Sequence, residues 1–266
     1  MIVSVICTVR NGESIIGQTI ESIMNQSFQN WEMVVVDDGS DDNTLEILKN
    51  YHAKDSRINY ISSIKVGRAK ALNIAINSCN GEFIANIDCD DPSHPNRLEF
   101  QLKAFEHFPK SSLITTKFHI ILDKQLINWD MVQYNREITD ITQSLIYGNS
   151  INHSSIMIKK NALLYVGGYN EKLQKQLDYD LWLRLVKKGI CIHQLNVALA
   201  TKRIHKDQSF ENKNRLRYLF SSLNVQKDSI IFLKGGINSW ILLFSRMFWG
   251  IMPQKIRLVI RGWIKK

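Results

Sequence analysis

Three carboxylates stand within four residues of one another at the end of a short apolar run. Asp88, Asp90 and Asp91 follow residues 83–87, a pattern that predicts a buried strand entering a loop. Because like charges this close repel one another, the arrangement is costly unless a cation or several hydrogen-bond donors lie among them. Acidic loops suit Mg²⁺ or Mn²⁺, which take phosphate oxygens as further ligands. The pattern indicates a metal and diphosphate site. The simpler alternative is that these acids cap a helix starting near Pro95.

The elements that must position these acids alternate along the first part of the chain. Apolar runs at residues 2–9, 31–36, 58–61 and 83–87 predict strands, and helical patterns separate them. Such an alternation predicts a parallel sheet with right-handed crossovers, in which ligands bind outside the carboxyl ends of the strands. We therefore expect the polar residues that directly follow strands to share one rim: Asn11, Asp37, Asp38, Asp88, Asp90 and Asp91.

Other phosphate-binding motifs are missing from the sequence. Neither GxGxxG nor GxxxxGK[ST] occurs, which argues against dinucleotide-dependent redox chemistry and against P-loop hydrolysis. The four cysteines are scattered without CxxC spacing, which fits reduced thiols better than disulfides or a zinc site. The first residues show no signal-peptide pattern, so a cytoplasmic location is expected.

Charge is distributed unevenly along the chain. Residues 201–266 hold 14 Lys and Arg against 3 Asp and Glu, net +11, whereas residues 1–200 hold 20 against 22, net −2. The basic excess therefore lies in the C-terminal segment. Its partner is expected to be anionic: a phospholipid surface, a lipid diphosphate or nucleic acid.

Four segments combine these features in one order. They are SVICTVRNGESIIGQTIESIMNQSFQNWEMVVVDDGSDDNT, NGEFIANIDCDDPSHPNRL, VGGYNEKLQKQLDYDLWLRLVKKG and RIHKDQS. Together they closely resemble the family 2 glycosyltransferases, and the resemblance spans roughly the first 210 residues. It implies an α/β, GT-A fold, in which a Rossmann-like, mostly parallel central sheet is flanked by helices. It also implies transfer of a sugar from a nucleotide diphosphate to an acceptor hydroxyl, with inversion at the anomeric carbon.

The resemblance implies nucleotide-binding roles for residues after the first two strands. In the DDGS segment Asp38 would contact the pyrimidine ring and the ribose, with Asp37 in support, and this segment favours a UDP-sugar donor. Thr8 and Asn11 correspond to the family's first strand-end segment, where Arg10 replaces the usual aromatic residue. A turn followed by a helix N-cap is the alternative interpretation of DDGS.

The resemblance also implies how the diphosphate and the metal are held. Asp90, the last acid of the DxD motif, would bind Mn²⁺ or Mg²⁺, and Asp88 would reach the ribose or a metal-bound water. Such an ion neutralises charge on the departing nucleoside diphosphate. Arg68 is a phosphate-binding candidate, with an exposed helix arginine as the alternative. His205 is a candidate ligand for the metal, with a surface residue as the alternative. His153 is interpreted as a core histidine on an apolar strand.

One further acid matches the family's catalytic base. Asp178 in LDYDLWLRL would take the proton of the acceptor hydroxyl, which is a weak nucleophile without such help. Asp180 is the alternative base, because two acids at i and i+2 of a helix do not share a face. An N-cap for the following helix is the structural alternative for Asp178.

The C-terminal segment is expected to be a helical, basic extension. Residues 211–266 follow a GT-A catalytic domain of residues 1–210, whose nucleotide-sugar half is about residues 1–110 and whose acceptor half is about 111–210. The run SWILLFSRMFWGIM places Trp240, Ile241, Phe244, Met247, Phe248 and Ile251 on one helical face. Some 16 residues are too few for a comfortable transmembrane span of roughly 20. Two interpretations remain, an interfacial membrane helix and a helical hairpin packed on protein.

These observations favour a metal-dependent glycosyltransferase of the hexosyl or N-acetylhexosaminyl type. We expect a saccharide acceptor, with a lipid diphosphate as its carrier, and a role in polysaccharide or lipopolysaccharide assembly at the inner face of the cytoplasmic membrane. A nucleotidyltransferase is the alternative enzyme, but its basic, Gly-rich segment after the first strand is missing. A nucleic-acid-binding module is the alternative outside enzymes, and no recognised nucleic-acid motif supports it.

Overall fold

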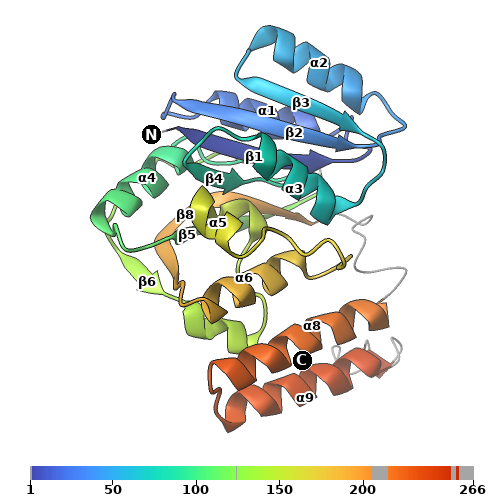
Figure 1. The fold of residues 1–266 in the computed structure, drawn as a ribbon, viewed down its shortest axis with the longest axis vertical. Helices are drawn as coiled ribbons and strands as arrows, with labels where there is room; N and C mark the ends of the chain where they lie inside the picture. The colour runs from blue at the N-terminus through green and yellow to red at the C-terminus, as the bar shows by residue number, and fades with distance from the viewer. Residues whose placement is uncertain (1, 124, 205–214, 253–255, 258–266) are drawn as a thin grey trace. The chain divides into compact units, whose positions relative to one another are not determined.

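The computed structural model describes residues 2–123, 125–204, 215–252 and 256–257 of the 266-residue chain. Its elements follow the predicted alternation of strands and helices (Figure 1). In chain order they are β1 (Val3–Val9), α1 (Ile16–Met24), β2 (Trp31–Asp38), α2 (Thr44–Lys54), β3 (Ile58–Ser63), α3 (Arg68–Ser78), β4 (Phe83–Asn86), α4 (Arg97–His107), β5 (Leu113–Leu122), β6 (Ile138–Asp140), the 3-10 helices η1 (Thr142–Tyr147) and η2 (His153–Ser155), β7 (Met157–Lys159), α5 (Lys160–Tyr165), α6 (Leu177–Lys187), β8 (Ile192–Ile204), α8 (Arg215–Phe232) and α9 (Ile237–Ile251).

The chain divides into two compact units. The larger, which we call the sheet unit, comprises Met1–Thr142 and Ile151–Lys206. The smaller, which we call the hairpin unit, comprises Gln143–Ser150 and Asp207–Lys266. The division of the catalytic domain into a nucleotide-sugar half and an acceptor half stays a prediction.

The sheet unit is built on one eight-stranded sheet. Its strands lie in the order β3-β2-β1-β4-β7-β5-β8-β6 (Figure 1). The pairs β1–β2, β2–β3, β1–β4 and β5–β8 are parallel, whereas β7 and β6 each pair antiparallel with their neighbours. Because β7 runs against both β4 and β5, those two strands point the same way. The predicted α/β fold with a mostly parallel central sheet and flanking helices is confirmed, and it is consistent with GT-A.

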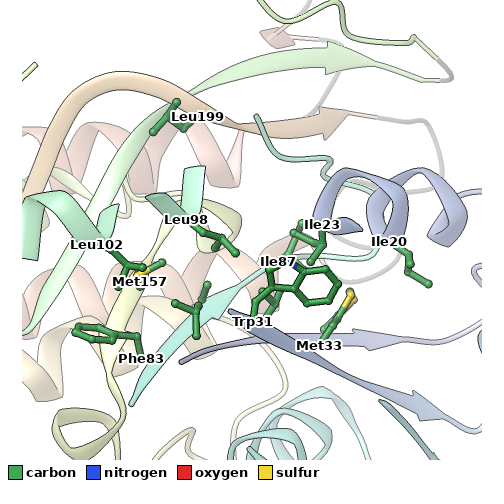
Figure 2. Packing of buried hydrophobic residues seen from close by; sticks show 14 of the residues in the cluster. Ile20, Ile23, Trp31, Met33, Phe83, Ile87, Leu98, Leu102, Met157 and Leu199 are labelled. Atoms are coloured by element: carbon green, nitrogen blue, oxygen red, sulfur yellow. The ribbon is translucent and has the colours of Figure 1, made fainter. Parts of the chain in front are cut away.

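A core of alternating strand residues fixes which sheet face each helix covers. Along β1 the residues Val3, Val5, Cys7 and Val9 share one face, because successive strand side chains point to opposite sides. These four belong to a buried cluster with residues of α1, α2 and α4, and Figure 2 shows part of that cluster: Ile20, Ile23, Trp31, Met33, Phe83, Ile87, Leu98, Leu102, Met157 and Leu199. The helices α1, α2 and α4 therefore cover this face.

The strand order creates one natural ligand crevice. From β1 the chain proceeds through β2 and β3 on one side and then crosses to β4 on the other side. At such a switch point the loops after the two central strands diverge, and ligands bind between them. The loops that follow β1 and β4 are those of Asn11 and Asp88, so the predicted rim lies at this crevice.

The hairpin unit consists chiefly of α8 and α9. Ile146 of η1 joins Leu223 and Ile230 of α8 and Leu243 of α9 in a small buried cluster. A Cβ on Gly250 would lie only 2.2 Å from Leu219 Cδ2, so the absence of a side chain there permits the close approach of the two helices. None of the described helices is both long enough and apolar enough to cross a bilayer.

The predicted single apolar face of α9 is divided between two surroundings. Trp240 and Met247 pack against the buried cluster of the hairpin, whereas Ile241, Phe244 and Phe248 are exposed. The six residues lie on one side of α9 by helical spacing, as predicted, but Trp240 and Met247 pack inward while the others stay exposed. Pairing with α8 turns one side of α9 inward, and the sequence of α9 alone does not show where that partner lies.

Candidate active site

Asp88 follows β4 beside the switch point of the sheet and is held by two basic side chains. Its Oδ1 accepts hydrogen bonds from Arg68 Nη2 at 2.6 Å and from His153 Nδ1 at 2.8 Å. Burial alone would raise the pKa of Asp88, but the guanidinium of Arg68 and then His153 hold it well below its usual range. Asp88 is therefore an ionised acid that the protein itself neutralises.

The other ring nitrogen of His153 is also engaged. Nε2 lies 2.7 Å from Asn86 Nδ2 and 2.8 Å from Tyr169 Oη. The chain places His153 in η2, not on a strand, and its side chain is buried. The interpretation as a core histidine was right about burial but wrong about the strand, and it missed the contact with Asp88. Within the polar run Asn152–Ser155, His153 and Ser154 contact the acidic loop, by which we mean residues 88–91. The side chains of Asn152 and Ser155 instead form hydrogen bonds with Thr201 and Thr115.

Asp91 fastens the acidic loop to distant parts of the sheet unit. Its Oδ2 accepts from Ser154 Oγ at 2.6 Å and its Oδ1 accepts from the backbone N–H of Arg203 at 2.7 Å. Burial, followed by the charges of Asp88 and Asp90, raises the pKa of Asp91 well above its usual range. The alternative interpretation, in which these acids cap a helix near Pro95, does not hold, since the N-cap of α4 is Asn96.

Arg203 secures the same loop from β8. Its side chain is buried and donates to the carbonyl oxygens of Asp90, Asp123 and Gln125 and to Gln18 Oε1. Four acceptors from three separate segments thus converge on one guanidinium, whose planar set of donors suits such a junction. The RIHKDQS segment therefore contributes a structural residue in addition to the predicted ligand His205, which lies outside the described residues.

Replacing Arg203 by methionine is expected to destabilise the sheet unit by roughly 3 kcal/mol, because buried carbonyl groups lose their charged donor. Thermal unfolding measures this effect. Lys202→Met is the matched control, since Lys202 is the exposed neighbour in β8, and it should leave the melting temperature nearly unchanged. Equal melting temperatures for the two variants would contradict the role assigned to Arg203.

The loops after β1 and β2 form the opposite wall of the crevice. The backbone N–H of Asn11 donates to Ser40 Oγ, and Asn11 Oδ1 accepts from the backbone N–H of Asp41. Asp37 accepts from both the backbone N–H and the hydroxyl of Ser40, which is the turn chemistry expected of DDGS. Thr8 stands near the end of β1, opposite Val36 of β2. Arg10 Nε donates to Gly39 O and its guanidinium pairs with Asp41, so this cation takes part in joining the two loops.

Asp38 joins this wall to the start of α3. Its Oδ1 accepts from the backbone N–H groups of Val66 at 2.6 Å and Gly67 at 3.1 Å. Gly67 has φ +92°, a conformation that favours glycine, and this conformation aims its N–H at the carboxylate. Arg68 is the first residue of α3, so Asp38 fixes the loop that delivers Arg68 to Asp88.

Two acids in the first turn of α6 point to different partners. Asp180 Oδ2 accepts from Arg184 Nε at 2.8 Å, one helical turn further on. The charge of Asp178 instead acts on the crevice. After Asp88 it raises the pKa of Arg68, and in addition to burial it raises the pKa of Tyr169. The charge of Asp178 thus acts on Arg68 and Tyr169, whereas Asp180 is paired with Arg184. The N-cap of α6 is Gln176, so Asp178 is not its capping residue.

Asp90 is the acid of this loop that could bind a hard cation, with phosphate oxygens as the further ligands. The carboxylate of Asp90 contributes to the raised pKa of Cys89, after burial, and of Asp91, after burial and Asp88. Negative charge therefore accumulates at this end of the acidic loop, while Asp88 is compensated by Arg68 and His153. Within the described ranges no group of three or more His, Cys, Asp and Glu side chains forms a ready metal cage. Oxygen ligands from a diphosphate are compatible with one protein carboxylate.

The chain was compared with protein families and with known proteins. The sequence profile of the family described as "Glycosyl transferase family 2" matches residues 4–165. The "Putative glycosyltransferase EpsE" of Bacillus subtilis is 29% identical over 260 residues, which cover 96% of this chain and 91% of that protein. A chondroitin synthase of Escherichia coli is 30% identical over 229 residues, which cover 80% of this chain but only 32% of the synthase.

Solved structures share the fold of this chain. The crystal structure of Staphylococcus aureus TarS residues 1–349 in complex with UDP-GlcNAc gives a TM-score of 0.68 at 20% identity. The match covers 87% of this chain and 67% of that one. The same TarS fragment in complex with UDP gives a TM-score of 0.64. At this level of identity the likeness concerns the fold.

Proposed function

Because this chain belongs to glycosyl transferase family 2, we propose that it transfers a sugar from a UDP-sugar to an acceptor hydroxyl in the assembly of a cell-surface polysaccharide or lipopolysaccharide. The ion pair between Arg68 and Asp88 beside the switch point of the sheet is the observation that carries this proposal, and the charge of Asp178 acts on the same arginine. The TarS complexes with UDP and UDP-GlcNAc support a UDP-sugar donor. Relatives called chondroitin synthase and hyaluronan synthase support a role in polysaccharide assembly.

In this mechanism the two walls of the crevice bind the donor. Asp38, with Asp37, binds the nucleoside beside the loop of Thr8 and Asn11, and Asp88 contacts the ribose. Arg68 donates to the diphosphate, since its guanidinium matches phosphate oxygens and its side chain is half exposed. The acceptor hydroxyl then attacks the anomeric carbon from the side opposite the diphosphate, which inverts the configuration there.

Asp178 removes the proton from the attacking hydroxyl. Asp178 lies in the first turn of α6, and its charge acts on Arg68, the residue that pairs with Asp88. Such a general base contributes about 10²–10⁴-fold to the rate. Asp180 is the less suitable candidate, because its Oδ2 already accepts from Arg184 Nε.

Asp90 would hold Mn²⁺ or Mg²⁺, and His205 is the second proposed ligand. When bound, the ion supplies positive charge against the diphosphate that leaves. The acidic loop that carries Asp90 is fixed by Arg203, Ser154 and the backbone of β8, so the backbone of Asp90 is held in place before any ligand arrives.

Calorimetric titration of the full chain with UDP, GDP and CDP in the presence of Mn²⁺ tests the donor assignment. We expect heat of binding with UDP and weaker or no binding with the other two nucleotides. Binding of GDP or CDP in preference to UDP would overturn the UDP-sugar assignment while leaving the family unchanged. Failure of all three to bind would overturn the proposed nucleotide site.

The hairpin unit is proposed to dock on the anionic inner face of the cytoplasmic membrane, where a lipid-diphosphate-linked acceptor would reside. Its helix α9 exposes an apolar stripe at spacings of four and three residues: Ile237, Ile241, Phe244, Phe248 and Ile251. Lys227 and Lys234 of this unit are exposed, as is Arg217, and they complement anionic headgroups.

Flotation with vesicles of anionic phospholipid tests this docking. The double variant Ile241→Ser, Phe248→Ser is expected to lower the vesicle-binding constant about 100-fold, because each of the two inserted apolar side chains contributes on the order of 1.5 kcal/mol. The matched control is Ile64→Ser, Leu164→Ser, which removes two exposed apolar side chains from the sheet unit. Docking through α9 is wrong if both double variants float like the wild type.

A further inference from the structure

Two basic side chains share Asp88 Oδ1, and they differ in their freedom to move. The Arg68 side chain is 50% exposed, whereas the His153 side chain is only 6% exposed. Arg68 reaches Asp88 at the end of a long flexible side chain. His153 is enclosed by Asn86, Tyr169 and the acidic loop itself. One partner of Asp88 can therefore leave it without disturbing the core, and the other cannot.

We propose that His153 is a positioning residue that keeps Asp88 oriented when Arg68 leaves it for the donor's diphosphate. This inference rests on the proposed function, in which Arg68 binds phosphate. A diphosphate carries more charge than a carboxylate and offers Arg68 two acceptor oxygens side by side. Without a second restraint, Asp88 would lose its orientation at the moment when the donor needs it.

The hydrogen bonds around His153 fix both its ring and its proton. An ionised carboxylate only accepts hydrogen bonds, so Nδ1 of His153 must carry the proton that faces Asp88. Tyr169 Oη and Asn86 Nδ2 approach the opposite ring nitrogen, Nε2, from two other segments of the chain. Tyr169 is itself fixed to α3, because its backbone N–H donates to Asn73 Oδ1 and its carbonyl accepts from Asn73 Nδ2.

The same segment also supports the backbone of the acidic loop. The backbone N–H of Asp88 donates to the hydroxyl of Ser154, which in turn donates to Asp91. Residues 153 and 154 thus hold Asp88 by its side chain and by its main chain. Ser154 keeps the backbone in place when the histidine is altered, so a variant at position 153 is expected to fold.

A double-mutant cycle between His153 and Asp88 tests the proposal. His153→Leu is expected to weaken UDP binding in Mn²⁺ about tenfold, a change of about 1.4 kcal/mol. In the background of Asp88→Asn the same substitution should have little further effect, because the histidine acts through that carboxylate. His153→Asn, which keeps an N–H donor near the position of Nδ1, should recover most of the affinity. Additive losses in the double variant, or no recovery with asparagine, would overturn the proposal.

A second measurement needs no nucleotide. In the free protein, ¹⁵N NMR of the histidine rings should show Nδ1 of His153 protonated, and Arg68→Gln, which imitates the departure of Arg68, should leave that signal unchanged. Loss of the Nδ1 proton in Arg68→Gln would overturn the proposal whatever nucleotide the protein binds. If wild-type protein fails to bind UDP, the donor assignment is wrong and the NMR result alone decides the role of His153.

Discussion

Asp178→Asn is expected to lower kcat by about 10²–10⁴-fold while leaving UDP affinity within a fewfold of wild type. Asparagine has nearly the shape of aspartate but cannot accept the proton of the acceptor hydroxyl. In the proposed site the nucleotide is held by other residues, on the loops after β1, β2 and β4, so its binding should not require the base. The rate of UDP release from the preferred UDP-sugar and acceptor measures kcat, and calorimetry with UDP measures affinity.

The matched control for this prediction is Asp180→Asn, the same change two residues along α6. Asp180 pairs with Arg184 and faces away from Asp178 on the helix, so its loss should affect stability slightly and kcat little. A large loss of kcat in Asp180→Asn combined with near-normal activity in Asp178→Asn would assign the base to Asp180 instead.

Asp90→Asn is expected to abolish the enhancement of UDP affinity by Mn²⁺, a loss of at least about 100-fold. Changing only the outer shell of a metal site costs about 10–100-fold in metal affinity, and removal of a charged ligand should cost more. Calorimetric titration with UDP, first in Mn²⁺ and then in EDTA, measures the enhancement for each variant. The UDP affinity of the wild-type protein in EDTA should equal the UDP affinity of Asp90→Asn in Mn²⁺.

Asp41→Asn serves as the control for charge at the rim. Asp41 is an exposed acid after β2 that pairs with Arg10, and no metal-binding role is proposed for it. Its removal should leave the Mn²⁺ enhancement intact. If Asp90→Asn keeps the full enhancement as well, the metal is held elsewhere or is not used.

The rim could be predicted from sequence because local patterns determine it. Strand lengths, turn residues and the rule that parallel strands end on one edge together bring Asn11, Asp37, Asp38 and Asp88 to the crevice. The parallel pairing of β1 to β4 follows from their regular alternation with helices. These features depend on residues close in sequence, and the sequence therefore contains enough information to place them.

The support of the acidic loop could not be predicted in the same way. His153 and Arg203 contact Asp88 and Asp91 across separations of 65 and 112 residues, and nothing in the local pattern specifies those pairings. One signal was available: the run Asn152–Ser155 is polar within an otherwise apolar segment. Buried polar side chains require hydrogen-bond partners, so such a run indicates a segment that supports a neighbouring loop through hydrogen bonds.

The carboxylate of Asp38 illustrates a second limit of sequence reasoning. Its expected contact with the nucleotide stays a prediction, and the structure adds an unexpected contact with the backbone of Val66 and Gly67. Because Gly67 immediately precedes Arg68, the acid after β2 also helps to set the position of the phosphate-binding candidate. One residue can therefore serve the fold and the site together.

The most direct test of the central claim is ¹H NMR of the full chain incubated with UDP-GlcNAc and other UDP-sugars in Mn²⁺. Cleavage of an α-linked UDP-sugar through an inverting site should release UDP and a sugar that appears first as the β-anomer, with Asp178→Asn and EDTA each suppressing the reaction. First appearance of the α-anomer would contradict inversion. Absence of UDP release from every UDP-sugar, with a suitable saccharide acceptor present, would contradict the proposed transfer itself.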